Sequence, residues 1–355
     1  MPASLSVPYL NMVERLSQSQ TDIDQAVLSV LHSGQFIAGP YRSLCEKAVS
    51  KLVGLPFAVG VGSGTSALKM ALQALGVGPG DEVILPAISF VATFESIAQT
   101  GATPVVVDVQ SNRPLISNLE IEKAITKKTK AIVPVHLYGN FASVESFGLP
   151  TVDDAAQALG SCPISHGTLT TLSFYPTKII GGVGDGGMVL CQSKELANQI
   201  RALGHHGVSG GQQSLVRHGH MPGNDRMDEI QAAAIVAQLP DLRRRVTRRQ
   251  QISEAYDHAL QHWKPFRNPA SNASIYAFCH PEREKLKLAL SERGIGTAIY
   301  YDTPLSQHPL NPHPKACPNA EIYCRQTLAL PCHAGMNDKE LDYVVSQLKT
   351  VLKLL

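Results

Sequence analysis

The stretch FAVGVGSGTSALKMALQALGVGPGDEVILP (residues 57–86) contains a strand, a turn, a helix and a second strand in close succession. The segment FAVGVG at 57–62 is short and apolar, as buried strands are. Over 63–76, alanine and leucine recur at helical spacing, and Gly76 marks the end of the helix. Residues 78–86 then form a turn and another apolar strand. This stretch therefore predicts an α/β fold in which a helix packs on a sheet.

The same alternation of strands and helices continues beyond this stretch. Further helices are predicted at 89–101 and 118–126. Further strands are predicted at 103–109, 131–137, 150–156, 168–174 and 186–191, which with the first two makes seven. Continuous apolar strands that alternate with helices are typical of a mostly parallel sheet covered on both faces. Ligands in such folds bind beyond the carboxyl ends of the strands, so we expect the chemistry in those loops.

The pattern changes near residue 225, where two long helical segments separated by Pro240 begin. After them the chain mixes short strands with helices. We therefore predict a large domain over 1–240 and a smaller C-terminal α/β domain over 241–355. The basic run RRRVTRR at 243–249 lies in the second long helix and is interpreted as a solvated helix face.

Composition indicates a globular protein. The 355 residues are 44% hydrophobic and 17% charged, with a formal net charge of +2. So small a charge gives no electrostatic reason to expect nucleic acid or an anionic membrane as the partner. The chain has no run of about 18 apolar residues, and its start has no signal-peptide pattern. We therefore expect a cytoplasmic location.

Neither the cysteines nor the histidines predict a metal site. The seven cysteines are scattered without a C-x-x-C pair, which is typical of reduced thiols. His205, His206, His218 and His220 lie in one glycine-rich loop but lack the spacing of metal ligands.

Four loops contain residues that could bind a ligand. In GSGTSA (62–67), the backbone N–H groups of Gly64, Thr65 and Ser66 would lie at the N-terminus of a helix, where anions bind. Many such turns need small residues for steric reasons alone, so this signal is weak by itself.

The other three loops are DDAAQA (153–158), SFYPTK (173–178) and PGNDR (222–226). A carboxylate at the end of an apolar strand must be solvated, paired or hydrogen-bonded, although it could also cap the next helix. Each loop has such an ordinary explanation. Taken together, they offer an N–H group for a phosphate, a carboxylate for a cationic ring nitrogen and a lysine for an aldehyde, as pyridoxal phosphate requires.

The ordered motifs resemble those of the DegT/DnrJ/EryC1/StrS family of pyridoxal-phosphate-dependent sugar aminotransferases. The resemblance covers most of the chain, and its motifs include FIAGPYRSLCEKAVSKLVG, AVGVGSGTSALKMALQALGVGPGDEVILPAISFVAT, AIVPVHLYG, DDAAQA, SFYPTK, GDGGMV, GNDRMDEIQAA and LALPCHAGMND. It implies the fold of type I pyridoxal-phosphate transferases, with a large domain built on a mostly parallel seven-stranded sheet and a smaller C-terminal α/β domain. It also implies a homodimer with its active sites at the subunit interface.

The resemblance assigns roles to single residues. Lys178 would form the Schiff base and afterwards move protons. Asp154, the second acid of its pair, would bind the pyridine nitrogen, Gln157 the ring hydroxyl, and Phe90 would stack on the ring. Gly64, Thr65, Ser66 and Ser173 would hold the phosphate, together with Asn224 of the neighbouring subunit.

The sequence departs from the family at several positions. Ile179 stands where relatives often have Asn, and the loop at 140–152 is short. Tyr300 and Tyr301 lie where family members often have a His-Tyr-Pro motif. These departures fall in the loops that would contact the substrate.

The function that the resemblance implies is transfer of an amino group from glutamate to a keto-sugar, with a nucleotide-linked 3- or 4-keto-6-deoxyhexose as the expected substrate. Such a reaction belongs to amino-sugar biosynthesis for polysaccharides or secondary metabolites. A carbocyclic ketone without a nucleotide is an alternative substrate, and a non-catalytic regulatory role is another. Dehydratases of the same family have His in place of the lysine, so Lys178 argues against that activity.

Overall fold

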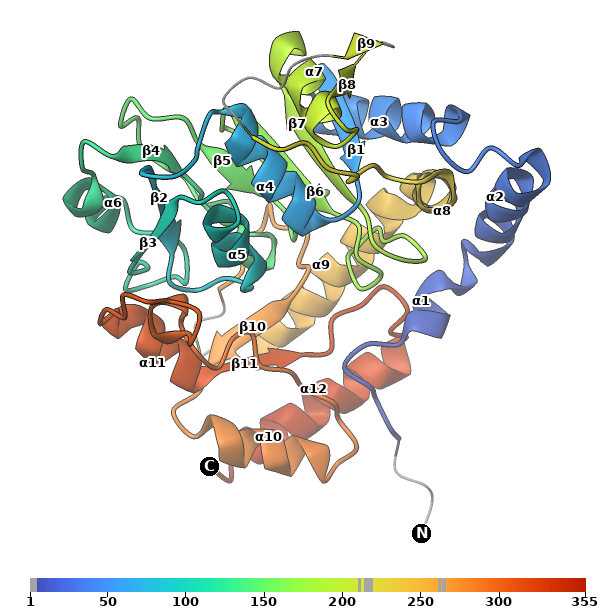
Figure 1. Ribbon diagram of the computed structural model, residues 1–355. Coiled ribbons are helices and arrows are strands. Elements are labelled where there is room, and N and C mark those ends of the chain that lie inside the picture. The colour runs from blue at the N-terminus through green and yellow to red at the C-terminus, as the bar shows by residue number, and fades with distance from the viewer. Residues whose placement is uncertain (1–4, 210–211, 214–219, 261–262, 264–265) are drawn as a thin grey trace.

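The computed structural model describes residues 5–209, 212–213, 220–260, 263 and 266–355. A large α/β part is followed by a smaller C-terminal part, and helix α9 (Leu242–Ala259) connects the two (Figure 1).

Seven strands build the sheet of the large part. They are β1 (Phe57–Val61), β2 (Glu82–Pro86), β3 (Thr103–Val107), β4 (Thr129–Ile132), β5 (Val152–Asp154), β6 (Leu169–Ser173) and β7 (Gly187–Cys191). They pair in the orders β3-β2-β4 and β5-β6-β7-β1. Parallel bridges from Ile132 to Thr151 and from Val135 to Asp154 join the two groups. Only β7 runs antiparallel to its neighbours, so the expected mostly parallel sheet is confirmed.

Helices cover this sheet as the alternation predicts. Those that follow strands of the sheet are α4 (Gly64–Ala74), α5 (Ala92–Ala98), α6 (Asn118–Ala124), α7 (Lys194–Leu203) and, further on, α8 (Glu229–Gln238). The buried face of α4 consists mainly of alanine, leucine and methionine and belongs to the largest apolar cluster. Before the sheet come α1 (Met12–Ser17), α2 (Gln20–Ser33) and α3 (Pro40–Val53), of which α2 and α3 lie beside α8 (Figure 1).

The C-terminal part has its own apolar cluster. Its strands β10 (Tyr276–Cys279) and β11 (Thr327–Leu330) are antiparallel, and its helices are α10 (Arg283–Ser291), α11 (Pro318–Gln326) and α12 (Asp338–Leu352). Val7, from the start of the chain, packs in this cluster. Short elements complete the chain: the 3₁₀ helices Leu137–Gly139, Leu239–Asp241 and Leu305–Gln307, and strands β8 (Val208–Ser209) and β9 (Gln212–Gln213). The domain boundary at residue 240 stays a prediction.

The interpretation of 243–249 as a solvated face is wrong for two of its arginines. Arg245 is 0% exposed and Arg249 is 3% exposed. Their guanidinium groups reach acceptors inside the protein, mainly backbone carbonyl oxygens. Such pairing offsets the cost of burying a charge, and a count of charges along the sequence does not detect it.

No helix in the described ranges is long and apolar enough to cross a membrane. All seven cysteines are free thiols. Among the described residues, no three His, Cys, Asp or Glu side chains are grouped to hold a metal ion, and His218 lies outside the described residues.

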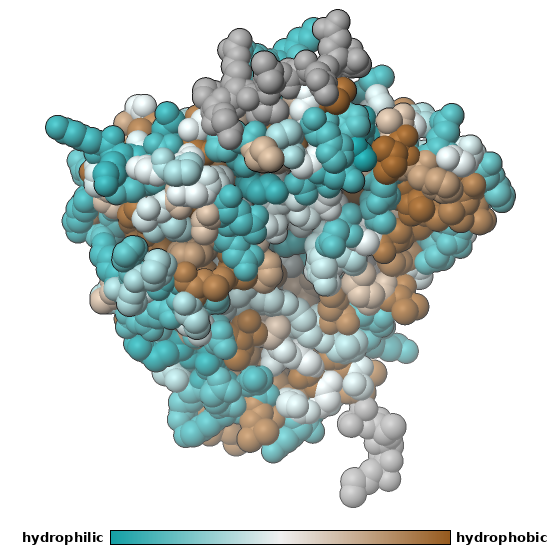
Figure 2. Space-filling model, viewed as in Figure 1, coloured by the Kyte–Doolittle hydropathy of each residue, from teal (hydrophilic) through white to brown (hydrophobic). Residues whose placement is uncertain are grey.

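Apolar side chains gather on the surface over α2 and the segment after it (Figure 2). Leu28, Leu31, Phe36 and Ile37 are each between 46% and 49% exposed. Scattered apolar residues are normal on protein surfaces, but a group of large ones is typical of an interface.

The start of β7 packs closely against the turn before α4, and a substitution there can test this contact. A Cβ atom on Gly187 would lie 2.2 Å from the carbonyl oxygen of Ser63. We therefore expect Gly187→Ala to lower the free energy of unfolding by about 1–3 kcal/mol, measured by denaturant unfolding. Gly78→Ala is the control, because the nearest atom there is 3.5 Å away. Equal stability of the two variants would contradict this packing.

Candidate active site

Lys178 lies in a tight loop directly after β6. Its backbone N–H donates to the carbonyl oxygen of Tyr175 at 2.8 Å, and the N–H of Gly182 donates to that of Phe174 at 2.7 Å. Burial lowers the pKa of Lys178 below its ordinary value, and the carboxylate of Asp154 raises it in part. A larger fraction of this amine is therefore uncharged at neutral pH than in an exposed lysine, as a nucleophile requires.

Asp154 lies at the end of β5, the strand that pairs in parallel with β6. Its side chain is buried, and two donors orient it: the Thr93 hydroxyl at 2.8 Å from Oδ2 and the Ala156 N–H at 3.2 Å from Oδ1. Burial raises the pKa of Asp154, while the Thr93 and Ala156 hydrogen bonds and Lys178 lower it in part. The result is an oriented carboxylate beside the lysine.

Asp153 faces the other way. Its Oδ2 accepts the backbone N–H groups of His166 at 2.9 Å and Gly167 at 2.8 Å. Adjacent residues of a strand point to opposite faces of the sheet, which explains why only one acid of the pair interacts with Lys178. That acid is Asp154, the one that the resemblance selects.

Gln157 is held between two tyrosines. Its Oε1 accepts the backbone N–H of Tyr138 at 2.6 Å, and its Nε2 donates to the Tyr301 hydroxyl at 3.4 Å. The ring of Phe90, which is 59% exposed, lies 6.3 Å from the ring of Tyr301 between centroids. Burial raises the pKa of Tyr301, and the Asp154 carboxylate raises it further. Tyr301 therefore lies near Gln157, Phe90 and Asp154.

The turn before α4 lies against the end of β6. Ser63 caps the helix, since its Oγ accepts the N–H of Ser66 at 3.0 Å. A Cβ atom on Gly64 would lie 2.8 Å from Cβ of Ser173, so these two residues are in contact. Within the described residues, the N–H groups of Gly64 and Thr65 have no acceptor in the chain. They are therefore available to an acceptor next to the Ser173 hydroxyl.

Asn224 lies in the segment beside this turn. Its neighbour Asp225 accepts the Ser66 hydroxyl at 2.9 Å and pairs with the Lys69 amine at 3.0 Å. Asn224 itself is exposed, and its backbone bridges to His205. Its side chain is therefore accessible to a neighbouring molecule.

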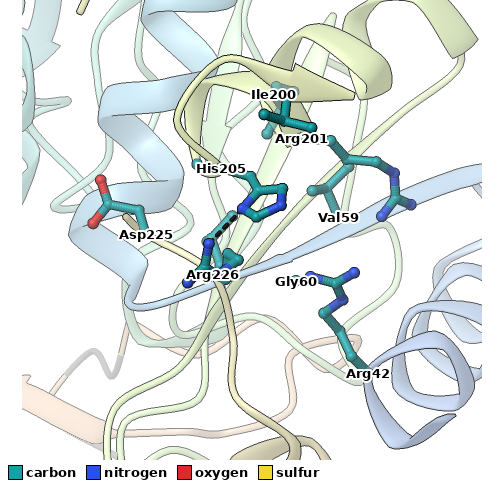
Figure 3. A pocket seen from close by; sticks show the side chains of 11 residues that line it. Arg42, Val59, Gly60, Ile200, Arg201, His205, Asp225 and Arg226 are labelled. Atoms are coloured by element: carbon teal, nitrogen blue, oxygen red, sulfur yellow. Dashed lines mark hydrogen bonds between the residues drawn. The ribbon is translucent and has the colours of Figure 1, made fainter. Parts of the chain in front are cut away.

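A basic cavity lies beside this segment, and Asp225 and Arg226 are among the residues that line it (Figure 3). Arg42, Arg201 and Arg226 line it, and Arg226 is hydrogen-bonded to His205. Arg201 donates twice to the Glu46 carboxylate, at 2.8 and 3.1 Å. The lining does not include Lys178 or the residues around it, so this cavity is separate from the lysine site.

Ile179 fills a position where relatives often have Asn. Its side chain is buried in the apolar cluster that also contains Phe174, Ile235 and Leu239. An amide side chain would have to find hydrogen-bond partners in that cluster. The departure from the family pattern therefore fits the packing of this chain.

The sequence did not assign roles to two residues of the site. Thr93 orients Asp154 from helix α5, and Tyr301 contacts Gln157 from a loop 144 residues further along the chain. Thr93 follows Phe90 by three positions in a quoted motif, which is a weak signal. Nothing near Tyr301 indicates its contact with Gln157.

Comparison with known proteins identifies the family. Residues 17–349 match the sequence model of the DegT/DnrJ/EryC1/StrS aminotransferase family. The chain belongs to this family. The resemblance, the fold class and the enzyme class that it implied are thereby confirmed.

This aminotransferase family member is similar to two curated relatives over almost their whole length. A "pleiotropic regulatory protein" of Geobacillus stearothermophilus is 35% identical, with 97% of this chain and 98% of the relative covered. A UDP-2-acetamido-2-deoxy-3-oxo-D-glucuronate aminotransferase of Pseudomonas aeruginosa is 32% identical, with 96% and 99% covered. Among solved structures, NtdA of Bacillus subtilis with bound cofactor PMP is 27% identical, with a TM-score of 0.91 and 99% and 86% covered.

The electrostatic interaction between Lys178 and Asp154 can be tested in the protein without cofactor. The rate at which the Lys178 amine is acylated, followed by mass spectrometry against pH, should have its midpoint below the ordinary pKa of 10.5. Asp154→Asn should move the midpoint further down, because a nearby carboxylate stabilises the ammonium form.

Asp153→Asn is the matched control and should leave this midpoint in place, since that carboxylate faces the opposite side. A midpoint at or above the ordinary value, or equal shifts in both variants, would show that the pair does not interact as described.

Proposed function

We propose that this aminotransferase binds pyridoxal phosphate through Lys178 and transfers an amino group from glutamate to a nucleotide-linked keto-sugar. The observation that carries the proposal is the half-buried Lys178 amine beside the buried, oriented carboxylate of Asp154. A lysine and a carboxylate in this relation are what the cofactor's aldehyde and ring nitrogen require.

The residues of the site fit the cofactor. The N–H groups of Gly64 and Thr65 and the hydroxyl of Ser173 would hold its phosphate, with Ser66 in the same turn. Asp154 would pair with the protonated ring nitrogen and Gln157 Nε2 would donate to the ring hydroxyl. The exposed ring of Phe90 offers a flat apolar surface on which the cofactor ring can stack.

When bound, pyridoxal phosphate supplies an electron sink that stabilises the charge left by a departing Cα proton. Lys178 Nζ would be the group that accepts this proton from the amino donor and carries it during the transfer. Its lowered pKa suits the role, because a general base works best when its pKa is near the operating pH. The Asp154 carboxylate would hold the protonated ring nitrogen.

The substrate class is inferred from the relatives. The P. aeruginosa relative is named for a UDP-linked 3-oxo sugar, so we propose a nucleotide-linked keto-sugar. The form that the resemblance implies is a 3- or 4-keto-6-deoxyhexose. The product would enter amino-sugar biosynthesis. A regulatory role is the second candidate, because the Geobacillus relative is named as a regulatory protein. The intact arrangement of Lys178, Asp154 and Gln157 favours catalysis.

We also propose that the protein acts as a homodimer whose active sites lie at the subunit interface. Asn224 is exposed beside the turn that precedes α4, where it can reach a second subunit. The apolar group over α2 gives the dimer a surface to bury.

Replacement of Lys178 tests the catalytic role. Lys178→Ala and Lys178→Arg should each reduce amino transfer from glutamate to a panel of nucleotide-linked keto-sugars by at least about 10³-fold, since nucleophile and proton carrier are both lost. Lys194→Ala, at an exposed position on α7, is the control and should keep full activity. Transfer retained by both Lys178 variants would refute the assignment.

Mixing two inactive variants tests the shared site. If Asn224 serves the partner's cofactor, a heterodimer of Lys178→Ala with Asn224→Ala has one site with both defects and one intact site. Refolding the two variants together should therefore restore activity that neither variant has alone. If Asn224 acts within its own subunit, every site carries a defect and no activity returns.

A further inference from the structure

Arg245 is the largest side chain that is fully buried in the described structure. Its guanidinium Nη1 donates to the carbonyl oxygen of Ile179 at 2.9 Å and to Oε1 of Gln238 at 3.0 Å. Its Nη2 donates to the Ser19 hydroxyl at 3.0 Å, and that hydroxyl in turn donates to Asp241. Both terminal nitrogens of this buried guanidinium group therefore donate to specific acceptors.

Two of those contacts lead to the loop that carries Lys178. Ile179 follows the lysine directly. Gln238, oriented by Arg245, donates from Nε2 to the carbonyl oxygen of Gly181 at 2.6 Å. Arg245 therefore reaches Ile179 directly and Gly181 through Gln238.

The other end of the loop is fixed by its own backbone. Lys178 N–H donates to Tyr175, and Gly182 N–H donates to Phe174. A Cβ atom at Gly181 would lie 2.7 Å from the carbonyl oxygens of Tyr175 and Pro176, so the loop is folded closely on itself. The backbone is therefore held by hydrogen bonds on both sides of Lys178.

We propose that Arg245 is a positioning residue, which fixes the loop so that the Lys178 amine meets the aldehyde of pyridoxal phosphate in the productive direction. This inference rests on the proposed function. Arg245 acts through the Ile179 carbonyl group and through Gln238, and it is not one of the residues that would hold the cofactor. Since a misplacement of about 1 Å can slow a reaction about 10²-fold, small movements of this loop matter.

The same helix provides a matched comparison. Arg249 lies one turn further along α9 and is almost as buried, but its Nη1 donates to the carbonyl oxygens of Ala273, Ser274 and Cys332. Those residues belong to the C-terminal part of the chain. Arg245 and Arg249 thus resemble each other in burial and chemistry and differ in whether they reach the lysine loop.

The test compares Arg245→Lys with Arg249→Lys in the full-length protein. Lysine keeps the positive charge but lacks the planar fork that donates to several acceptors in fixed directions. Pyridoxal phosphate is added to cofactor-free protein, and the rate of covalent capture by Lys178 is followed by visible absorbance and confirmed by borohydride reduction and peptide mapping. Denaturant unfolding of each cofactor-free variant measures stability separately.

We expect Arg245→Lys to slow capture by about 10- to 100-fold, while Arg249→Lys captures at the wild-type rate despite a similar loss of stability. If Arg245→Lys does not fold, Gln238→Met replaces it, because it removes the contact to Gly181 and should also slow capture. Capture at the wild-type rate by the folded Arg245 or Gln238 variant, or equal slowing by Arg249→Lys, overturns the inference. Wild-type protein that captures no pyridoxal phosphate would instead overturn the proposed function.

Discussion

The parallel pairing of β5 with β6 is the constraint on which the candidate active site depends. It places the carboxyl ends of both strands at one edge of the sheet, with Asp154 opposite Thr171, two residues before Ser173. The antiparallel strand β7 then brings Gly187 against both β6 and the turn that precedes α4. Three loops from distant parts of the sequence therefore meet where a phosphorylated ring would bind.

The electrostatic character of the site follows from this arrangement. A half-buried lysine amine and a buried aspartate carboxylate lie close enough for each to shift the pKa of the other. Each needs fixed donors or acceptors nearby to stay there. Thr93 and Ala156 orient the acid, and on the lysine side Arg245 and Gln238 hold the backbone of the loop.

The local parts of this account could be predicted from the sequence. Apolar runs located the strands, and alternation along β5 separates Asp154 from Asp153. The sequence could not place Tyr301 beside Gln157, because a contact across 144 residues depends on how the C-terminal part packs. The sequence also led to the wrong environment for Arg245 and Arg249. Their acceptors are mostly backbone carbonyl groups, which every residue has, so no sequence pattern reveals them.

A covalent bond between Lys178 and pyridoxal phosphate beside Asp154 would be visible in a crystal structure of the wild-type protein, grown with pyridoxal phosphate and without an amino donor. We expect continuous density from Lys178 Nζ to the cofactor, the ring nitrogen within hydrogen-bond distance of Asp154, and the phosphate at Gly64 and Thr65. A cofactor bound through another lysine, or with its ring nitrogen away from Asp154, would contradict it.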